Sequence, residues 1–291
     1  MAIEQYSSFS NSRTFDDFFT ALSRKNHPFF AAAHRGICGD VPENSLAAFQ
    51  ECLKQNIYLI EVDIQRSKDG HLVIMHDITV NRMTDGKGRI SELTLEQLQT
   101  FSLKEKSGGI DAKLTDEKIP TLKEVLALAK GRAMFNLDKA WEYREELYDL
   151  VEQADAFDHV LLKSGEPIEQ VIEFLKSKEK PLHYMHKIQD STLHELDALL
   201  NRVSPLAIEI LFANETDEVI SKPILSKMRS CSNVWGNALD NGGNAHHTDS
   251  LSLLEPDKGW GWLLDRGINI IQTDYAVELM HYEEKRKTSG R

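Results

Sequence analysis

The spacing of hydrophobic positions along this chain switches repeatedly between the period of a strand and that of a helix. Short apolar runs typical of strands occupy residues 29–33, 58–65, 133–139, 159–163, 182–187, 206–212, 233–239 and 269–274. Apolar positions at helical spacing occupy residues 121–130, 141–153, 167–178, 191–202, 222–230, 256–265 and about 276–288. Alternating strands and helices predict an α/β fold with a parallel sheet, and the strand count favours a closed (β/α)8 TIM barrel. The alternative, an open doubly wound sheet, lacks a Gly-x-Gly-x-x-Gly turn after its first strand.

One more helix is expected before the first strand. Residues Ser12 to Arg24 place Phe15, Phe18 and Leu22 on one face, which predicts an amphipathic helix. We expect this aromatic face to cap the bottom of a core rather than to bind a ligand.

A second apolar run, residues 72–77, follows the strand 58–65 after a Lys68-Asp69-Gly70 turn and predicts an additional short strand. The sequence from there to residue 119 is rich in glycine and polar residues. We therefore interpret residues 64–119 as a small insertion after the second strand, mounted over the C-terminal mouth of the barrel. The whole chain, residues 1–291, is otherwise expected to form a single barrel domain.

Composition narrows the classes of partner. The net charge is −12, which disfavours binding to nucleic acid or to an anionic membrane surface. There is no run of 18 apolar residues, and the N-terminal sequence lacks the basic and apolar regions of a signal peptide. The three cysteines cannot all pair internally, which suits a reducing compartment. A cytoplasmic protein that acts on a small molecule is the expectation; its oligomeric state stays open.

Carboxylates gather at the predicted ends of neighbouring strands. Glu61 and Asp63 lie on one face of a strand and start roughly 7 Å apart, since a strand rises about 3.3 Å per residue. Asp138 ends the next barrel strand. Three carboxylates without a cluster of histidine or cysteine ligands favour one Ca²⁺ or Mg²⁺ ion over zinc. The alternative is that the two acids form the solvent-facing side of an amphipathic strand.

Other polar residues are expected at the same mouth, because parallel barrel strands end at one face. His34 and His76 are candidates for a general acid and base near neutral pH. Arg35 and Lys163 are candidate cations for an anionic substrate. Trp235 is a candidate contact for the alcohol part of a substrate, with plain barrel core as the alternative.

Several motifs carry a resemblance to a known family. The sequence AHRG at 33–36, PENS at 42–45, IEVDIQRSKDGHLVIMHD at 60–77 and IPTLKEVL at 119–126 resembles the glycerophosphodiester phosphodiesterase family, a branch of the phospholipase-C-like phosphodiesterase barrels. The resemblance implies a metal-dependent TIM barrel with an insertion after the second strand. It also implies that His34 and His76 are the acid–base pair, that Glu61 and Asp63 bind the metal, and that Arg35 contacts the phosphate.

The chain departs from the family pattern on the next strand. The family has Glu-x-Lys there, with the glutamate on the metal and the lysine on the phosphate, whereas this chain has Asp138 and Ala140. Lys139 is expected to face the helix layer by strand alternation, unless the strand ends there. We therefore predict that Lys163, at the end of the following strand, supplies the missing positive charge.

The function implied by the resemblance is hydrolysis of glycerophosphodiesters to an alcohol and glycerol phosphate, as part of lipid and glycerol metabolism. The alternatives are a phosphodiesterase that acts on a lysophospholipid or another phosphodiester, and a non-catalytic protein that binds phosphoesters. The identity of the alcohol, the choice between Ca²⁺ and Mg²⁺, and attack by water or by a substrate hydroxyl stay open.

Overall fold

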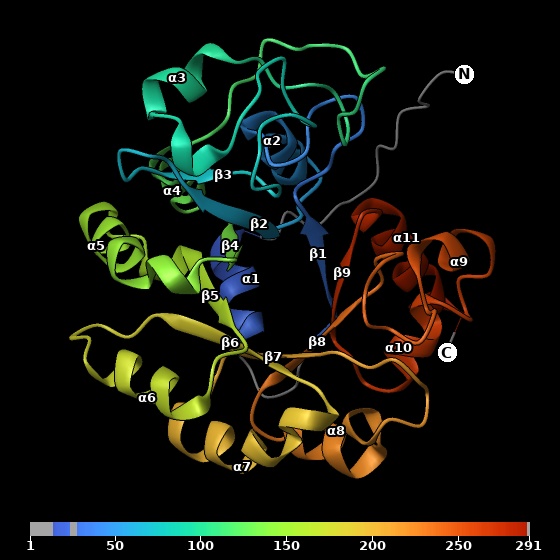
Figure 1. Cartoon of the computed structure of the whole chain (residues 1–291). Coiled ribbons are helices and arrows are strands. Elements are labelled where there is room, and N and C mark those ends of the chain that lie inside the picture. The colour runs from blue at the N-terminus through green and yellow to red at the C-terminus, as the bar shows by residue number, and fades with distance from the viewer. Residues whose placement is uncertain (1–13, 24–27, 290–291) are drawn as a thin grey trace.

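A computed structural model describes residues 14–23 and 28–289 of the chain (Figure 1). Eight of its strands run parallel and close into a barrel, in the order β1-β9-β8-β7-β6-β5-β4-β2 with β2 paired to β1. Their bounds are β1 Phe30–His34, β2 Leu59–Arg66, β4 Met134–Asp138, β5 Val160–Ser164, β6 His183–Ile188, β7 Ala207–Ile210, β8 Asn233–Asn237 and β9 Ile270–Thr273. The predicted (β/α)8 TIM barrel is confirmed, with strand bounds within three residues of those expected.

Helices surround the barrel and bury the outward face of each strand in one large core. They are α2 Leu46–Lys54, α4 Leu122–Ala129, α5 Arg144–Ala154, α6 Ile168–Lys176, α7 Leu196–Ala198, α8 Lys222–Arg229, α9 Asp249–Leu254, α10 Trp260–Asp265 and α11 Ala276–Thr288. The outward side chains of β2, Ile60, Val62 and Ile64, are fully buried in this core.

Two predicted helices have a different form. Residues 191–202 form a 3-10 turn over Asp190–Glu195, then α7, and then a π-turn over Leu199–Val203, rather than one regular helix. The helix predicted over 256–265 is shorter, since α10 begins only at Trp260, and a separate helix that was not predicted, α9, ends at Leu254 before Pro256. A proline restricts the residue before it to extended backbone, which ends the helix at that point.

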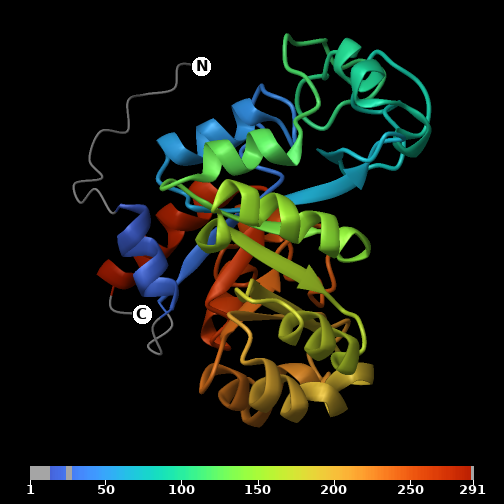
Figure 2. The same ribbon diagram turned by 90° about the vertical axis from the view of Figure 1, so that its left-hand side faces the viewer.

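The helix α1 Phe15–Leu22 closes the amino-terminal end of the barrel, as Figure 2 shows. Its buried residues Phe15, Phe18 and Leu22 pack on the lower interior of the barrel, which confirms the expected cap. That interior layer consists of Phe30, Ala32, Leu59, Met134, Leu161, Met185, Ala207, Trp235 and Ile270. The predicted helix ends Ser12 and Arg24, and the N-terminal residues considered for a signal peptide, lie outside the described residues.

A small lobe follows β2 and has its own core (Figure 2). It begins with the short strand β3 Leu72–Ile74, antiparallel to the end of β2, and includes the helix α3 Leu95–Thr100. Its core residues are Val73, Met75, Val80, Met83, Ile90, Leu98, Leu103 and Ile119. The lobe also contacts the loop between β1 and α2, where the Glu43 amide donates to the backbone oxygen of Lys106 at 2.9 Å. It is thus joined to the barrel at the carboxyl ends of β1 and β2. None of the helices described is both long enough and apolar enough to cross a lipid bilayer.

Candidate active site

The polar residues of the barrel mouth follow from the alternation along each strand. Leu59, Met134, Leu161 and Met185 point into the lower barrel, so residues two and four positions later point into the upper barrel. These later residues are Glu61 and Asp63 on β2, Asn136 and Asp138 on β4, Lys163 on β5 and Lys187 on β6. The fold therefore replaces an apolar interior layer by a charged one at the carboxyl end of the strands, where barrel enzymes place their chemistry.

Three carboxylates meet in this upper layer. Glu61, Asp63 and Asp138 each place one oxygen within 4.8 Å of the others, and Asp63 lies directly beside Asp138 in the register of β2 and β4. Burial and the neighbouring carboxylate of Asp63 raise the pKa of Glu61 to about 7. Ionising all three groups in a buried space is therefore costly without positive charge beside them.

Four basic side chains surround this cluster. The ammonium of Lys139 lies 2.9 Å from Asp63 Oδ1, and the guanidinium of Arg35 lies 3.3 Å from Asp63 Oδ2. Burial alone would raise the pKa of Asp63, but these cations outweigh it and lower that pKa. Asp138 receives Lys163 on Oδ2 at 2.9 Å and Lys187 on Oδ1 at 3.2 Å. Burial would raise the pKa of Asp138, but the charges of Lys163 and Lys187 outweigh it and lower that pKa.

The donor set fits a hard divalent cation. Carboxylate oxygens are the preferred ligands of Ca²⁺ and Mg²⁺, and three of them converge on one point. Burial and the neighbouring charge of Asp63 raise the pKa of Glu61, and a bound cation would offset both effects. The acidic cluster predicted from the sequence is therefore assembled by the fold and is able to hold a metal ion.

His34, the last residue of β1, faces the carboxylates. Its Nε2 atom lies 3.9 Å from Glu61, and its Nδ1 atom lies 2.7 Å from Asp274, just past β9. A carboxylate can only accept a hydrogen bond, so Nδ1 carries the proton and Nε2 is presented to the site. Burial lowers the pKa of His34, but the bond to Asp274 and the charge of Glu61 overcome it, and the net shift is upward.

His76 lies on the lobe, beyond β3, and is oriented in the same way. Its Nδ1 atom lies 2.8 Å from Asp77, and Asp77 accepts two hydrogen bonds from Arg82 at 2.8 and 2.9 Å. Arg82 also donates to the buried Glu43 at 2.7 Å, which in turn accepts from Arg35 at 3.0 Å. A continuous chain of ion pairs therefore joins the lobe histidine to the barrel arginine.

The backbone around these residues is held in left-handed conformations. Arg35 and Asn44 both have φ of 55°, and Lys139 has φ of 57°. Asn44 donates from Nδ2 to Asp63 Oδ2 at 3.0 Å, so the loop after β1 orients a carboxylate of β2. Gly36 also has no room for a side chain, because a Cβ there would lie 2.8 Å from Cβ of Ala48. Non-glycine residues at positive φ are costly and concentrate at functional sites.

Lys139 corrects the sequence analysis. The expectation that it faces the helix layer is wrong, because β4 ends at Asp138 and strand alternation stops there. The left-handed backbone of Lys139 turns its side chain to the mouth, where it also donates to the backbone oxygen of His76 at 2.7 Å. No feature of the sequence marked this turn.

Lys163 is almost fully buried beneath the mouth. Its side chain is 2% exposed, and its ammonium is held between Asp138 and Glu209 at 2.9 and 3.6 Å. Burial disfavours its charge, but these carboxylates outweigh that effect and raise its pKa. Lys187, which the sequence analysis did not select, occupies the more open position on the same aspartate.

Trp235 is fully buried in the lower interior of the barrel, beneath the charged layer. Its indole nitrogen donates to Asn237 at 3.2 Å, and Asn237 donates to Glu209 at 2.8 Å. This placement agrees with the core interpretation and leaves no surface for the alcohol part of a substrate.

Asp274, Asp77 and Arg82 are site residues to which the sequence analysis gave no role. Two of them had weak indications in the sequence, since Asp77 directly follows His76 and Asp274 ends the last predicted strand.

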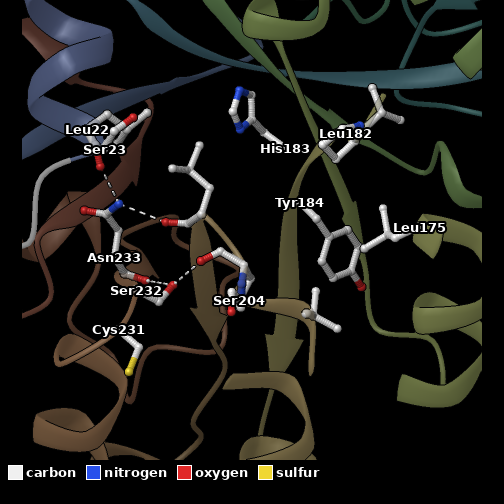
Figure 3. A pocket seen from close by; sticks show the side chains of 14 residues that line it. Leu22, Ser23, Leu175, Leu182, His183, Tyr184, Ser204, Cys231, Ser232 and Asn233 are labelled. Atoms are coloured by element: carbon white, nitrogen blue, oxygen red, sulfur yellow. Dashed lines mark hydrogen bonds between the residues drawn. The ribbon is translucent and has the colours of Figure 1, made fainter. Parts of the chain in front are cut away.

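A cavity of about 400 Å³ lies at the opposite end of the barrel (Figure 3). It is lined by the starts of β6 and β8 and by the end of α1, where Asn233 donates to the backbone oxygen of Leu22 at 2.9 Å. None of the three clustered carboxylates lines it. The clustered carboxylates therefore lie at the other end of the barrel from this cavity.

Comparison with known sequences gives two family matches and several relatives. The glycerophosphoryl diester phosphodiesterase family matches residues 34–212, and a domain of unknown function matches residues 184–282. The chain is 45% identical over 96 residues to a glycerophosphodiester phosphodiesterase of Caldanaerobacter subterraneus, which covers 33% of this chain and 38% of that protein. It is 44% identical over 97 residues to glycerophosphodiester phosphodiesterase 1 of Homo sapiens, covering 33% of this chain and 29% of that protein. These matches therefore span less than two fifths of each relative's length.

Solved structures share the fold over nearly the whole chain. A glycerophosphoryl diester phosphodiesterase from Parabacteroides distasonis has a TM-score of 0.74 at 20% identity, covering 92% of this chain and 91% of that one. An Oleispira antarctica phosphodiesterase in complex with the product sn-glycerol-3-phosphate has a TM-score of 0.63 at 20% identity, covering 88% and 96%. At these identities the likeness establishes the fold.

Proposed function

Because the chain belongs to the glycerophosphoryl diester phosphodiesterase family, we propose that it hydrolyses a glycerophosphodiester to an alcohol and glycerol phosphate. The observation that carries the proposal is a cluster of three carboxylates beside His34 at the mouth of the barrel. The Nδ1 atom of His34 is in turn held by a fourth carboxylate, that of Asp274. A second histidine on the adjoining lobe is fixed in the same way.

Glu61, Asp63 and Asp138 would hold one divalent cation, Ca²⁺ or Mg²⁺. Such an ion would neutralise phosphate oxygens and stabilise the charge that develops during transfer. The buried pairs around Asp63 and Asp138 keep these two ligands ionised, since the pKa of each is lowered. Arg35 lies on the same carboxylate, at 3.3 Å from Asp63, and would contact the phosphate.

The two imidazoles would move the protons of the reaction. Water or a neighbouring hydroxyl of the substrate attacks phosphorus, and the bond from phosphorus to the leaving alcohol oxygen breaks. Attack by the hydroxyl gives a cyclic phosphate, which water then opens to glycerol phosphate. One imidazole accepts the proton of the nucleophile, and the other donates a proton to the departing oxygen. Asp274 and Asp77 hold the two Nδ1 atoms, so His34 and His76 each present Nε2 for this exchange.

The overall charge of the chain favours a small, polar diester over a membrane lipid. The net charge of −12 disfavours an anionic lipid surface. A lysophospholipid is the second candidate substrate, and a direct comparison of glycerophosphocholine with lysophosphatidylcholine as substrates would decide between them.

Substitution of the histidines tests the proposal. His34→Ala and His76→Ala should each lower kcat on glycerophosphocholine by about 10²–10⁴-fold, the range for lost general acid–base catalysis. Glu61→Gln should fold but lose most of its affinity for the cation, measured by calorimetry, and its cation-dependent turnover. Glycerol phosphate release by the unaltered protein must be abolished by a chelator and restored by Mg²⁺ or Ca²⁺. A folded protein that releases no glycerol phosphate from any glycerophosphodiester with either ion would refute the proposal.

A further inference from the structure

We propose that Lys187 is the residue that binds an anionic oxygen of the phosphate, the role that the sequence analysis gave to Lys163. The inference rests on the proposed function and specifies which side chain of the mouth recognises the phosphoryl group.

The position of Lys187 on β6 directs it into the mouth. Met185, two residues earlier, belongs to the barrel interior, and Lys187 lies beside Glu209 of β7 in the sheet register. Its ammonium lies 3.2 Å from Asp138 Oδ1, one of the three clustered carboxylates. A group bound to that cluster would therefore be a close neighbour of this ammonium.

Lys187 also retains hydrogen-bonding capacity. Its side chain is 33% exposed, and Asp138 is its one ion-pair partner among residues 14–23 and 28–289. A lysine ammonium has three N–H donors, so two remain for a ligand. The ammonium is thus paired with a single carboxylate, on a side chain that is partly open to solvent.

The other cations of the mouth are more fully engaged. Lys163 is 2% exposed and lies between two carboxylates. Lys139 pairs with Asp63 and donates to the backbone oxygen of His76. Arg35 is 17% exposed and spans Glu43 and Asp63. Lys139 is 37% exposed but keeps only one free N–H donor, whereas Lys187 keeps two. Lys187 is therefore the partly exposed lysine of this set with the most donors left for an anion.

An anionic substrate needs such a charge. The carboxylates of Glu61, Asp63 and Asp138 repel a phosphate that approaches them, and Glu209 adds a fourth nearby acid. A lysine bound to Oδ1 of Asp138 can donate to the phosphate at the same time, in a charge-assisted hydrogen bond. Lys187 would thus bind the phosphoryl oxygen that the metal ion does not.

Binding of the product separates this role from a structural one. In saturating Ca²⁺, Lys187→Met should bind glycerol 3-phosphate about 10- to 100-fold more weakly by calorimetry, the loss expected for one hydrogen bond between charged groups. Its affinity for Ca²⁺ alone should stay the same or increase, because a like charge beside the ligands has been removed. Lys187→Arg should retain most of the affinity for glycerol 3-phosphate.

Lys180→Met is the matched control. It removes the same charge close before β6, where Lys180 pairs with Asp155 at 3.6 Å, and it should bind glycerol 3-phosphate as the unaltered protein does. An unchanged affinity in Lys187→Met, or an equal loss in Lys180→Met, would overturn the assignment. A loss of Ca²⁺ affinity parallel to the loss of product affinity would also overturn it, since Lys187 would then only position Asp138. If the unaltered protein hydrolyses glycerophosphocholine while Lys187→Met binds product normally, this inference fails and the proposed function stands.

Discussion

Replacement of Lys163 by methionine tests how the buried charges of the site are balanced. The ammonium of Lys163 is 2% exposed and lies 2.9 Å from Asp138 and 3.6 Å from Glu209. Removing one member of a buried ion pair costs about 3–5 kcal/mol, because the remaining charge stays buried without its partner. An unfolding entropy of about 2.1 cal/mol/K per residue over 291 residues gives about 0.6 kcal/mol per kelvin. The Tm of Lys163→Met should therefore be about 5–8 °C lower.

Thermal unfolding in EDTA measures this loss, and Lys187→Met is the matched comparison. Lys187 pairs with the same aspartate from a position that is 33% exposed, and such partly exposed pairs contribute only about 0–1 kcal/mol. Its Tm should fall by no more than about 2 °C. Saturating Mg²⁺ should recover part of the loss in Lys163→Met, since the ion restores positive charge beside Asp138. Equal Tm values for Lys163→Met and the unaltered protein in EDTA would refute the reasoning about buried charge.

Three further outcomes are expected. Asp274→Ala should lower kcat about tenfold or more, though less than His34→Ala measured alongside, because the imidazole loses the acceptor of its Nδ1 proton; an unchanged kcat would contradict that role. A thiol reagent at pH 8 should label the exposed Cys231 first, since burial raises the pKa of Cys38 to about 12; fast labelling of a second thiol in the folded protein would contradict this. Trp235→Phe should destabilise the fold by about 1–3 kcal/mol and leave KM for the diester within about twofold; a large change in KM would restore the substrate contact predicted from the sequence.

The barrel could be predicted from the sequence because its strands are short apolar runs separated by helical patterns. The clustered carboxylates followed as well, since Glu61, Asp63 and Asp138 obey strand alternation up to the last residue of their strands. Alternation is a local property of extended backbone, so it is visible in sequence order.

The cations could not be predicted in the same way. Lys139 lies just past its strand, in a left-handed conformation that sequence alternation cannot anticipate. The depths of Lys163 and Lys187 in the mouth depend on the stagger between β5 and β6, which pairs Lys163 with Met185 rather than with Lys187. Stagger is set by the closure of the whole barrel, so two lysines at similar strand positions acquire different surroundings.

The chain of ion pairs from Arg35 through Glu43, Arg82 and Asp77 to His76 connects two separate hydrophobic cores. His34 ends a strand that packs in the barrel core, whereas His76 directly follows Met75 of the lobe core. Small cooperative units of a protein can open without global unfolding. Catalytic inactivation on heating should therefore precede loss of the barrel's circular dichroism, because opening of the lobe and of its contacts with the barrel mouth is enough to separate the two proton carriers. The operating temperature of such an enzyme would be limited by its smaller core.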